Sequence, residues 1–85
     1  MLTLEEYTRI TDNLNSYNIG NEVYEEVYEG HNAVSVEINW GDWKHDHRCC
    51  DWIMAGLGYD LIDAEVTEED GSDCYSAIRR YKRRI

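Results

Sequence analysis

The chain contains no proline and no phenylalanine, and it has few cations for its length. Of its 85 residues, 18 are Asp or Glu and only 8 are Lys or Arg, so the formal net charge is −10. Its three cysteines are an odd number, which does not fit a secreted disulfide framework. No apolar run approaches the ~20 residues that span a bilayer, and no signal peptide is evident. We therefore expect a cytoplasmic protein with reduced thiols and no membrane contact.

The charges that are present are unevenly distributed along the chain. Residues 1–78 contain all 18 carboxylates but only three cations, which gives this part a charge of −15. The other five cations are Arg79, Arg80, Lys82, Arg83 and Arg84. A compact chain of this length has a radius of gyration of about 12 Å, so many carboxylates lie within the ~8 Å screening length of one another. Such a surface either provides solubility alone or binds a cationic partner.

The first half of the chain predicts a helix followed by a hairpin. Thr3 and Glu6 form a capping-box pattern, and apolar residues then recur at helical spacing as far as Tyr17, with an end near Asn18 and Gly20. Residues 22–40 favour two strands joined by a turn at residues 29–32. That turn would place Val27 opposite Val34 and Val23 opposite Ile38. The strict alternation of Val34, Val36, Ile38 and Trp40 predicts that these four side chains face the core.

The second half repeats this order. Asp42 is a candidate cap for a helix that ends at Gly58, with one face made of His45, Cys49, Trp52, Ile53, Gly56 and Leu57. Residues 59–68 and 74–83 predict a second hairpin that turns at Asp70 and Gly71, with Ile62, Ala64 and Val66 facing the core. We therefore predict a single α+β domain over residues 1–85. Its order is α-β-β-α-β-β, and two helices pack on one face of a four-stranded antiparallel sheet.

No catalytic motif is present: the chain has no GxSxG, P-loop or GxGxxG pattern. The one cluster of potential metal ligands is residues 45–50, where His45 and Cys49 would lie one helical turn apart. Cys74 could add a third ligand, but the spacing of a structural zinc motif is absent. We expect neither an enzyme nor a cofactor. A small metal-binding or thiol-dependent regulatory protein that uses His45, Cys49 and Cys74 remains the alternative.

The acidic rows on the two hairpins are the stronger functional signal. Carboxylates two residues apart on a strand lie about 6.6 Å apart, and such rows can imitate the charge of a nucleic-acid backbone. Interleaved tyrosines would provide rigid contact area. The residues predicted to bind a partner are Glu22, Tyr24, Glu25, Glu26, Tyr28, Glu29, Glu37, Glu68, Glu69, Asp70 and Asp73.

The basic end of the chain, RRYKRR, allows two interpretations. It could bind nucleic acid directly, but the acidic body would repel phosphate. As the last strand, it would instead lie beside Asp60, Asp63 and Glu65 and neutralise them. We favour this internal role, so no direct contact with nucleic acid is expected.

In size, acidity and lack of a catalytic motif, the chain resembles the small inhibitors that phages and mobile elements make against DNA-handling machinery. These classes include uracil-DNA glycosylase inhibitors, anti-restriction proteins and anti-CRISPR proteins, several of which are DNA mimics. The resemblance implies a non-catalytic protein that occupies the basic groove of a nucleic-acid-binding protein, such as a CRISPR effector.

Overall fold

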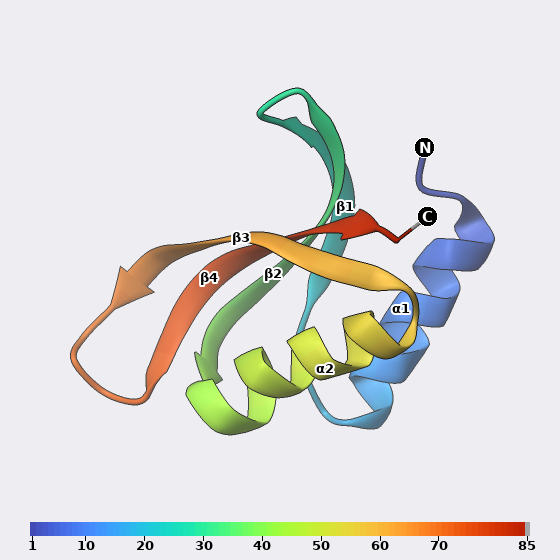
Figure 1. The fold of residues 1–85 in the computed structure, drawn as a ribbon. Helices are drawn as coiled ribbons and strands as arrows, with labels where there is room; N and C mark the ends of the chain where they lie inside the picture. The colour runs from blue at the N-terminus through green and yellow to red at the C-terminus, as the bar shows by residue number, and fades with distance from the viewer. Residues whose placement is uncertain (85) are drawn as a thin grey trace.

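The computed structural model describes residues 1–84 and shows two helices packed on one face of a four-stranded antiparallel sheet (Figure 1). The predicted α+β class and the order α-β-β-α-β-β are thereby confirmed. Within the described residues, no helix is long and apolar enough to cross a membrane. The elements are α1 (Leu4–Ser16), β1 (Glu22–Tyr28), β2 (His31–Asp42), the π-helical turn η1 (Trp43–His47), α2 (Arg48–Gly56), β3 (Tyr59–Glu69) and β4 (Cys74–Arg83).

Helix α1 begins at the predicted capping box. The Glu6 amide donates to Thr3 Oγ1 at 3.1 Å, and the Thr3 amide donates to Glu6 Oε1 at 3.2 Å. The helix buries Ile10 and Leu14 completely. Two residues after its last residue, Asn18 has a φ of 58°, which lets the Ile19 amide donate back to the Leu14 carbonyl at 3.0 Å. This left-handed residue turns the chain away from the helix axis and into β1.

The first hairpin has a tighter turn than the predicted turn over residues 29–32. Tyr28 pairs directly with His31, so only Glu29 and Gly30 form the turn, with φ values of 48° and 80°. Two left-handed residues are the signature of a type I′ turn. The pairing therefore shifts by two residues, and Val27 lies opposite Asn32 instead of Val34. Because the shift is even, each side chain keeps its predicted face, but Val27 lies beyond the core and is 72% exposed.

Strand β2 follows the predicted alternation only as far as Ile38. Val34, Val36 and Ile38 are fully buried, but the register with β4 shifts between Ile38 and Gly41. Trp40 lies in this bulge with a φ of 53° and is not buried in the core. The prediction for Trp40 was wrong because an extra residue in a bulge breaks the two-residue period of a strand.

The helical segment after β2 starts at Asp42, as predicted, but its buried face differs from the prediction. Asp42 Oδ1 accepts hydrogen bonds from the amides of Lys44 and His45, both at 2.8 Å. The first turn is π-helical, because the Arg48 amide donates to the Trp43 carbonyl five residues earlier. This wider turn rotates the following helix relative to a regular one. The buried residues are therefore His47, Cys50, Ile53 and Met54, whereas Trp52 is 68% exposed.

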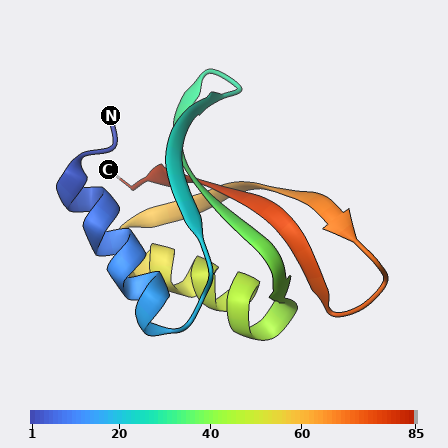
Figure 2. The same ribbon diagram turned by 180° about the vertical axis from the view of Figure 1, so that it is seen from behind.

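Strand β3 is an edge strand whose second half is not covered by the helices. Ile62, Ala64 and Val66 were predicted to face the core, but Ala64 is exposed, Ile62 is half-buried and Val66 is 50% exposed. Two bulges interrupt the pairing of β3 with β4, one of them at Ile62. Figures 1 and 2 show why the helices do not reach this part of the sheet: the β3–β4 hairpin extends well beyond α2.

The strand order β1-β2-β4-β3 places β4 between β2 and β3. One sheet face packs against both helices and carries the core (Figure 2). The opposite face, which we call the open face, has no helix over it in the described part of the chain. The buried core residues are Ile10, Leu14, Ile19, Val23, Val34, Val36, Ile38, Cys50, Ile53, Met54, Tyr59 and Tyr81.

Candidate functional site: the open face of the sheet

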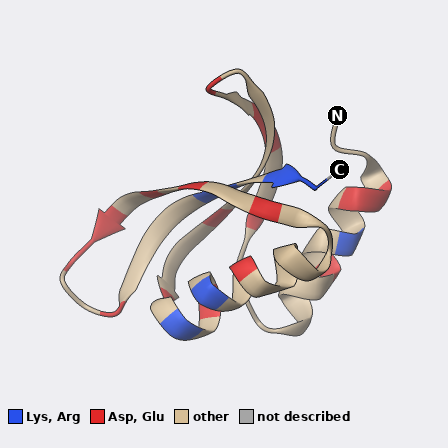
Figure 3. Cartoon of the chain, in the orientation of Figure 1, with Lys and Arg blue, Asp and Glu red and all other residues tan. Residues whose placement is uncertain are grey.

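The open face is strongly acidic. Alternate residues of each strand point to it, and the register identifies them across all four strands. Figure 3 shows carboxylates along both hairpins, whereas the strand cations lie on β4. Seven carboxylates share this face with Arg80, Lys82 and the Arg84 guanidinium that contacts Asp60; they are Glu22, Glu26, Glu37, Asp60, Asp63, Glu65 and Glu68.

Arg80 is the centre of an ion-pair network on this face. Its side chain comes from the middle of β4, and the residue is only 7% exposed. Nη1 lies 2.9 Å from both Asp63 Oδ2 and Glu65 Oε1, and Nε lies 3.1 Å from Glu26 Oε1. The guanidinium carbon also lies 4.5 Å from the centre of the Tyr28 ring, a cation–π distance. One buried cation therefore holds three carboxylates from both edge strands in fixed positions.

The Arg80 guanidinium keeps its charge in this network. Burial alone would lower the pKa of Arg80, but hydrogen bonds to Glu65, Glu26 and Asp63 raise it above its ordinary value. Ser35 Oγ donates to Glu26 Oε2 at 2.8 Å and so fixes the second oxygen of that carboxylate. With one guanidinium and three carboxylates, the cluster has a net charge of −2 on the surface.

Six of the predicted binding residues lie on the open face: Glu22, Tyr24, Glu26, Tyr28 and Glu37 on the first hairpin, and Glu68 near the end of β3. Glu22 and Glu37 lie directly opposite each other on neighbouring strands. Among residues 1–84 neither has a Lys or Arg ion-pair partner. Burial and the carboxylates of Glu37 and Glu26 raise the pKa of Tyr24 to about 12, so its hydroxyl stays protonated.

Glu25 is on the other face of the sheet. It pairs with the buried Val34, and its Oε2 lies 3.2 Å from the Met1 amino group and 3.7 Å from Arg83 Nη2. The N-terminal ammonium and Arg83 lower the pKa of Glu25 in spite of its partial desolvation. This carboxylate therefore belongs to an internal ion-pair cluster and is not part of the acidic open face.

The remaining predicted residues, like Glu68, lie at the ends of the two hairpins. Glu29 is in the first turn, and Glu68 and Glu69 end β3 on opposite faces of the sheet. Asp70 accepts a hydrogen bond from the Ser72 amide at 3.0 Å, and hydrogen bonds from Ser72 lower the pKa of Asp70. Asp73 follows in the same loop. The two hairpin ends point in different directions in Figure 1, so these residues do not form one cluster with Glu29.

The basic end of the chain pairs with the acids inside the molecule. Arg79 Nη2 lies 2.6 Å from Asp51 Oδ2, and Arg84 Nη2 lies 2.7 Å from Asp60 Oδ1. Arg80 contacts Asp63 and Glu65, as the favoured interpretation of this segment predicted. Consecutive residues of β4 face opposite sides, so Arg79 is directed to α2 while Arg80 is directed to the open face.

Glu6 connects α1 to the end of β4. It accepts hydrogen bonds from Arg83 Nε at 2.8 Å and from the Tyr59 hydroxyl at 2.6 Å. Hydrogen bonding to Arg83, in spite of desolvation, lowers the pKa of Glu6 from 4.5 to about 2. The folded state therefore binds the proton less readily than the unfolded state. This difference stabilises the fold above pH 4.5 and is lost as the pH falls toward 2.

We therefore expect Glu6→Gln to lower the free energy of unfolding by about 2 kcal/mol at neutral pH, since solvent reaches part of the ion pair. The difference from the unmodified protein should shrink as the pH falls below 4.5, the ordinary pKa of the group. Urea unfolding across this pH range measures it. Glu5→Gln removes the neighbouring exposed carboxylate and should change the free energy of unfolding much less. Equal losses of stability in the two variants would contradict the role assigned to Glu6.

The alternative metal site is not assembled. His45 Nε2 lies 2.9 Å from the Tyr17 carbonyl oxygen, on the side of η1 that faces α1. Within residues 1–84 no group of three His, Cys, Asp or Glu side chains is placed to hold a metal ion, so His45, Cys49 and Cys74 do not converge. His47 is fully buried and stacks on Tyr75 with ring centres 4.0 Å apart. His47 is therefore a packed core residue.

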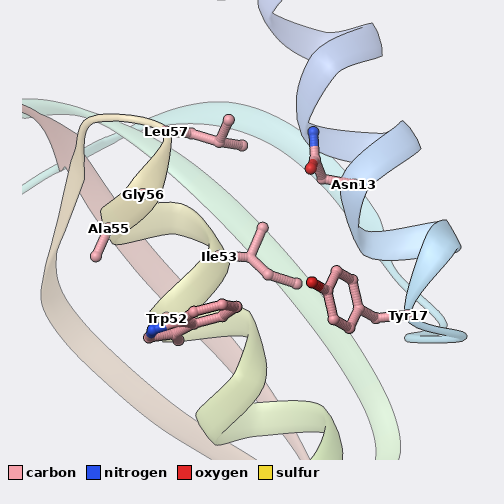
Figure 4. A pocket seen from close by; sticks show the side chains of 7 residues that line it. All are labelled: Asn13, Tyr17, Trp52, Ile53, Ala55, Gly56 and Leu57. Carbon is pink, nitrogen blue, oxygen red and sulfur yellow. The ribbon is translucent and has the colours of Figure 1, made fainter.

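A separate apolar groove lies between the two helices, away from the open face. Its volume is about 410 Å³. Figure 4 shows Tyr17, which follows α1, directed toward Ile53 of α2, and the other lining side chains include Asn13, Trp52 and Leu57. The groove has no charged lining residue. It therefore offers no complementarity to the cationic partner that the charge pattern predicts.

The sequence interpretation missed the central role of Arg80 and the exposure of Trp40. The one sequence signal that could have placed Arg80 on the same face as Asp63 is the two-residue alternation of side chains along β4. Comparison with protein-family models, curated proteins and solved structures finds no match to this chain. The geometry of its surface therefore carries the functional argument.

Proposed function

We propose that this protein is a non-catalytic binding protein whose open face occupies the basic nucleic-acid-binding groove of a protein partner. It would act as an inhibitor of the DNA-mimic type that phages and mobile elements produce, with a CRISPR effector or another DNA-handling enzyme as target. The observation that carries this proposal is that seven carboxylates share a sheet face, which no described helix covers, with three cations, Arg80, Lys82 and Arg84.

The spacing of these carboxylates supports the proposal. Neighbouring strands are about 4.8 Å apart, and residues on one face of a strand repeat every ~6.6 Å. The open face thus carries parallel rows of negative charge across four strands, with Tyr24 and Tyr28 between them. A groove lined by Lys and Arg is complementary to such an array, as it is to a phosphate backbone.

Two features of the array suggest that it serves binding more than stability. Glu22 and Glu37 face each other across β1 and β2, an arrangement of like charges that destabilises a sheet. Arg80, in contrast, fixes the positions of three carboxylates before any partner is present. Preorganised charges lose little conformational entropy on binding, which favours affinity.

The first test uses a double variant that changes charge without changing shape. Glu22→Gln with Glu37→Gln removes two unpaired acids of the open face, which lie opposite each other, and relieves their mutual repulsion. We expect the variant to be at least as stable as the unmodified protein, and its affinity for the target to fall about tenfold or more. The matched control is Glu5→Gln with Asp12→Asn, which removes the same charge from exposed positions of α1.

Affinity is measured as inhibition of DNA binding by three purified enzymes: a CRISPR effector nuclease, a restriction enzyme and a uracil-DNA glycosylase. For an enzyme that is inhibited, the rate constant for its association with this protein is also measured. Raising the salt concentration should lower this rate constant about tenfold or more, because screening weakens electrostatic steering. Absence of binding to all three at low salt, or binding that is insensitive to salt, would overturn the proposal. Equal losses in the open-face variant and the α1 control would show that only net charge matters.

A further inference from the structure

Trp40 has a backbone conformation that its own side chain disfavours. Its φ is 53°, in the left-handed region that bulky L-residues rarely adopt. Residues held in this region are enriched at functional sites, where the surrounding structure enforces the conformation. Trp40 is also 46% exposed, although tryptophan is the largest apolar side chain. A left-handed backbone and a half-exposed ring are both unfavourable for a tryptophan.

Hydrogen bonding and close packing of the backbone hold this conformation in place. The Trp40 amide donates to Ser76 Oγ at 2.8 Å, and Ser76 is fully buried. The next residue, Gly41, has no room for a side chain: a Cβ there would lie 2.5 Å from Ile38 Cγ2 and 2.9 Å from Asp46 Cβ. The bulge is therefore fixed by Ser76, Gly41 and Asp46. A glycine at position 40 would satisfy the same backbone path without strain.

Trp40 is located at the unneutralised end of the open face. It lies opposite Ser76 in the bulge, and Ser76 pairs with Glu68 on the other side. Glu37 is three positions earlier on the same strand. No Lys or Arg of residues 1–84 forms an ion pair with Glu37 or Glu68.

The other end of the open face shows how the same combination of groups binds a cation. There, Arg80 lies over the Tyr28 ring and between the carboxylates of Glu26, Asp63 and Glu65. An aromatic ring with nearby carboxylates is a favourable site for a guanidinium, which can stack and form hydrogen bonds at once. At the Trp40 end, Trp40 and Glu37 come from β2 and Glu68 comes from β3, and no Lys or Arg among residues 1–84 forms an ion pair with either acid.

We infer that Trp40 is the aromatic anchor of the open face and receives an arginine side chain of the cationic partner, with Glu37 and Glu68 as flanking acids. This inference rests on the proposed function and specifies where on the open face the partner is recognised. It also assigns a reason for the strained backbone at position 40. The strained bulge would present a partly exposed aromatic ring to the partner.

The test compares Trp40→Gly with Trp52→Ala, a change of the exposed tryptophan on α2. The probes are fluorescein-labelled nona-arginine and nona-lysine peptides, titrated at low and high salt. We expect the unmodified protein to bind the arginine peptide more tightly than the lysine peptide, because arginine stacks on aromatic rings better. Trp40→Gly should lose about tenfold in affinity for the arginine peptide and should abolish this preference. Trp52→Ala should retain both.

Thermal unfolding of the same proteins completes the test. Trp40→Gly should have an unfolding midpoint equal to or above that of the unmodified protein, because the left-handed strain is removed. An unfolded or clearly destabilised Trp40→Gly variant would assign the indole to the fold and overturn the inference. Unchanged arginine preference in a folded variant would overturn it while leaving the proposed function intact. If the unmodified protein shows no salt-dependent peptide binding, the charge complementarity behind both proposals fails.

Discussion

Replacing Arg80 with alanine is expected to lower the free energy of unfolding by about 3 to 5 kcal/mol, the cost of breaking a buried ion pair by removing one partner. Arg80 is the only described cation that lies among Glu26, Asp63 and Glu65, and these acids come from the two edge strands. Without the guanidinium, the three carboxylates repel one another across β4. In a domain of this size, such a loss lowers the thermal midpoint by more than about 12 °C.

Lys82→Ala is the matched control for this prediction. Lys82 is two residues further along β4 on the same face, but it is exposed and has no ion pair among the described side chains. Its removal should change stability by less than about 0.5 kcal/mol. High salt should recover part of the Arg80→Ala loss, since it screens the remaining repulsion. If the two variants unfold at the same denaturant concentration, Arg80 does not have the central role described.

The second large effect is expected for Asp51→Ala, on the other side of the same strand. Asp51 accepts hydrogen bonds from Arg79 Nε at 2.8 Å and from the Tyr81 hydroxyl at 2.5 Å. Arg79 and Tyr81 are both buried beneath α2. Removing the carboxylate leaves a buried guanidinium and a buried hydroxyl without this acceptor. We expect a loss of about 3 to 5 kcal/mol in the free energy of unfolding.

Chemical denaturation of Asp51→Ala beside Asp12→Ala separates this network from a general effect of charge. Asp12 is an exposed carboxylate of α1. Its removal reduces the overall negative charge equally and should change stability by less than about 0.5 kcal/mol. A loss at Asp51 no larger than that at Asp12 would show that Arg79 and Tyr81 find other partners.

Local signals in the sequence identified the elements and their ends. The Thr3–Glu6 capping box, the Asp42 cap and Gly58 after α2 are each satisfied by groups within a few residues, so pattern alone locates them. The buried face of α2 could not be read in this way. The π-helical turn after Asp42 depends on how the segment leaves the bulged end of β2, where Asp46 Oδ2 accepts a hydrogen bond from the Asp42 amide at 2.7 Å.

The candidate site shows the same division between local and long-range information. The two-residue period of β1 correctly brings Glu22, Tyr24, Glu26 and Tyr28 to one face, and the same period places Glu25 on the opposite one. The ion-pair network could not be predicted from either hairpin alone. Arg80 meets Glu26 only because β4 pairs with β2, and that pairing joins segments about half the chain apart.

The position of β4 between β2 and β3 has a consequence for how the fold assembles. Each hairpin closes through contacts between neighbouring segments, but the complete sheet forms only when β4 docks against β2. That step brings the acids of both hairpins together on one surface, and it also delivers Arg80 to the point where they converge. Repulsion between the hairpins and its neutralisation thus occur in the same event. The hairpins can join in the native register with Arg80 between them, whereas a register that misplaces Arg80 leaves the repulsion uncompensated.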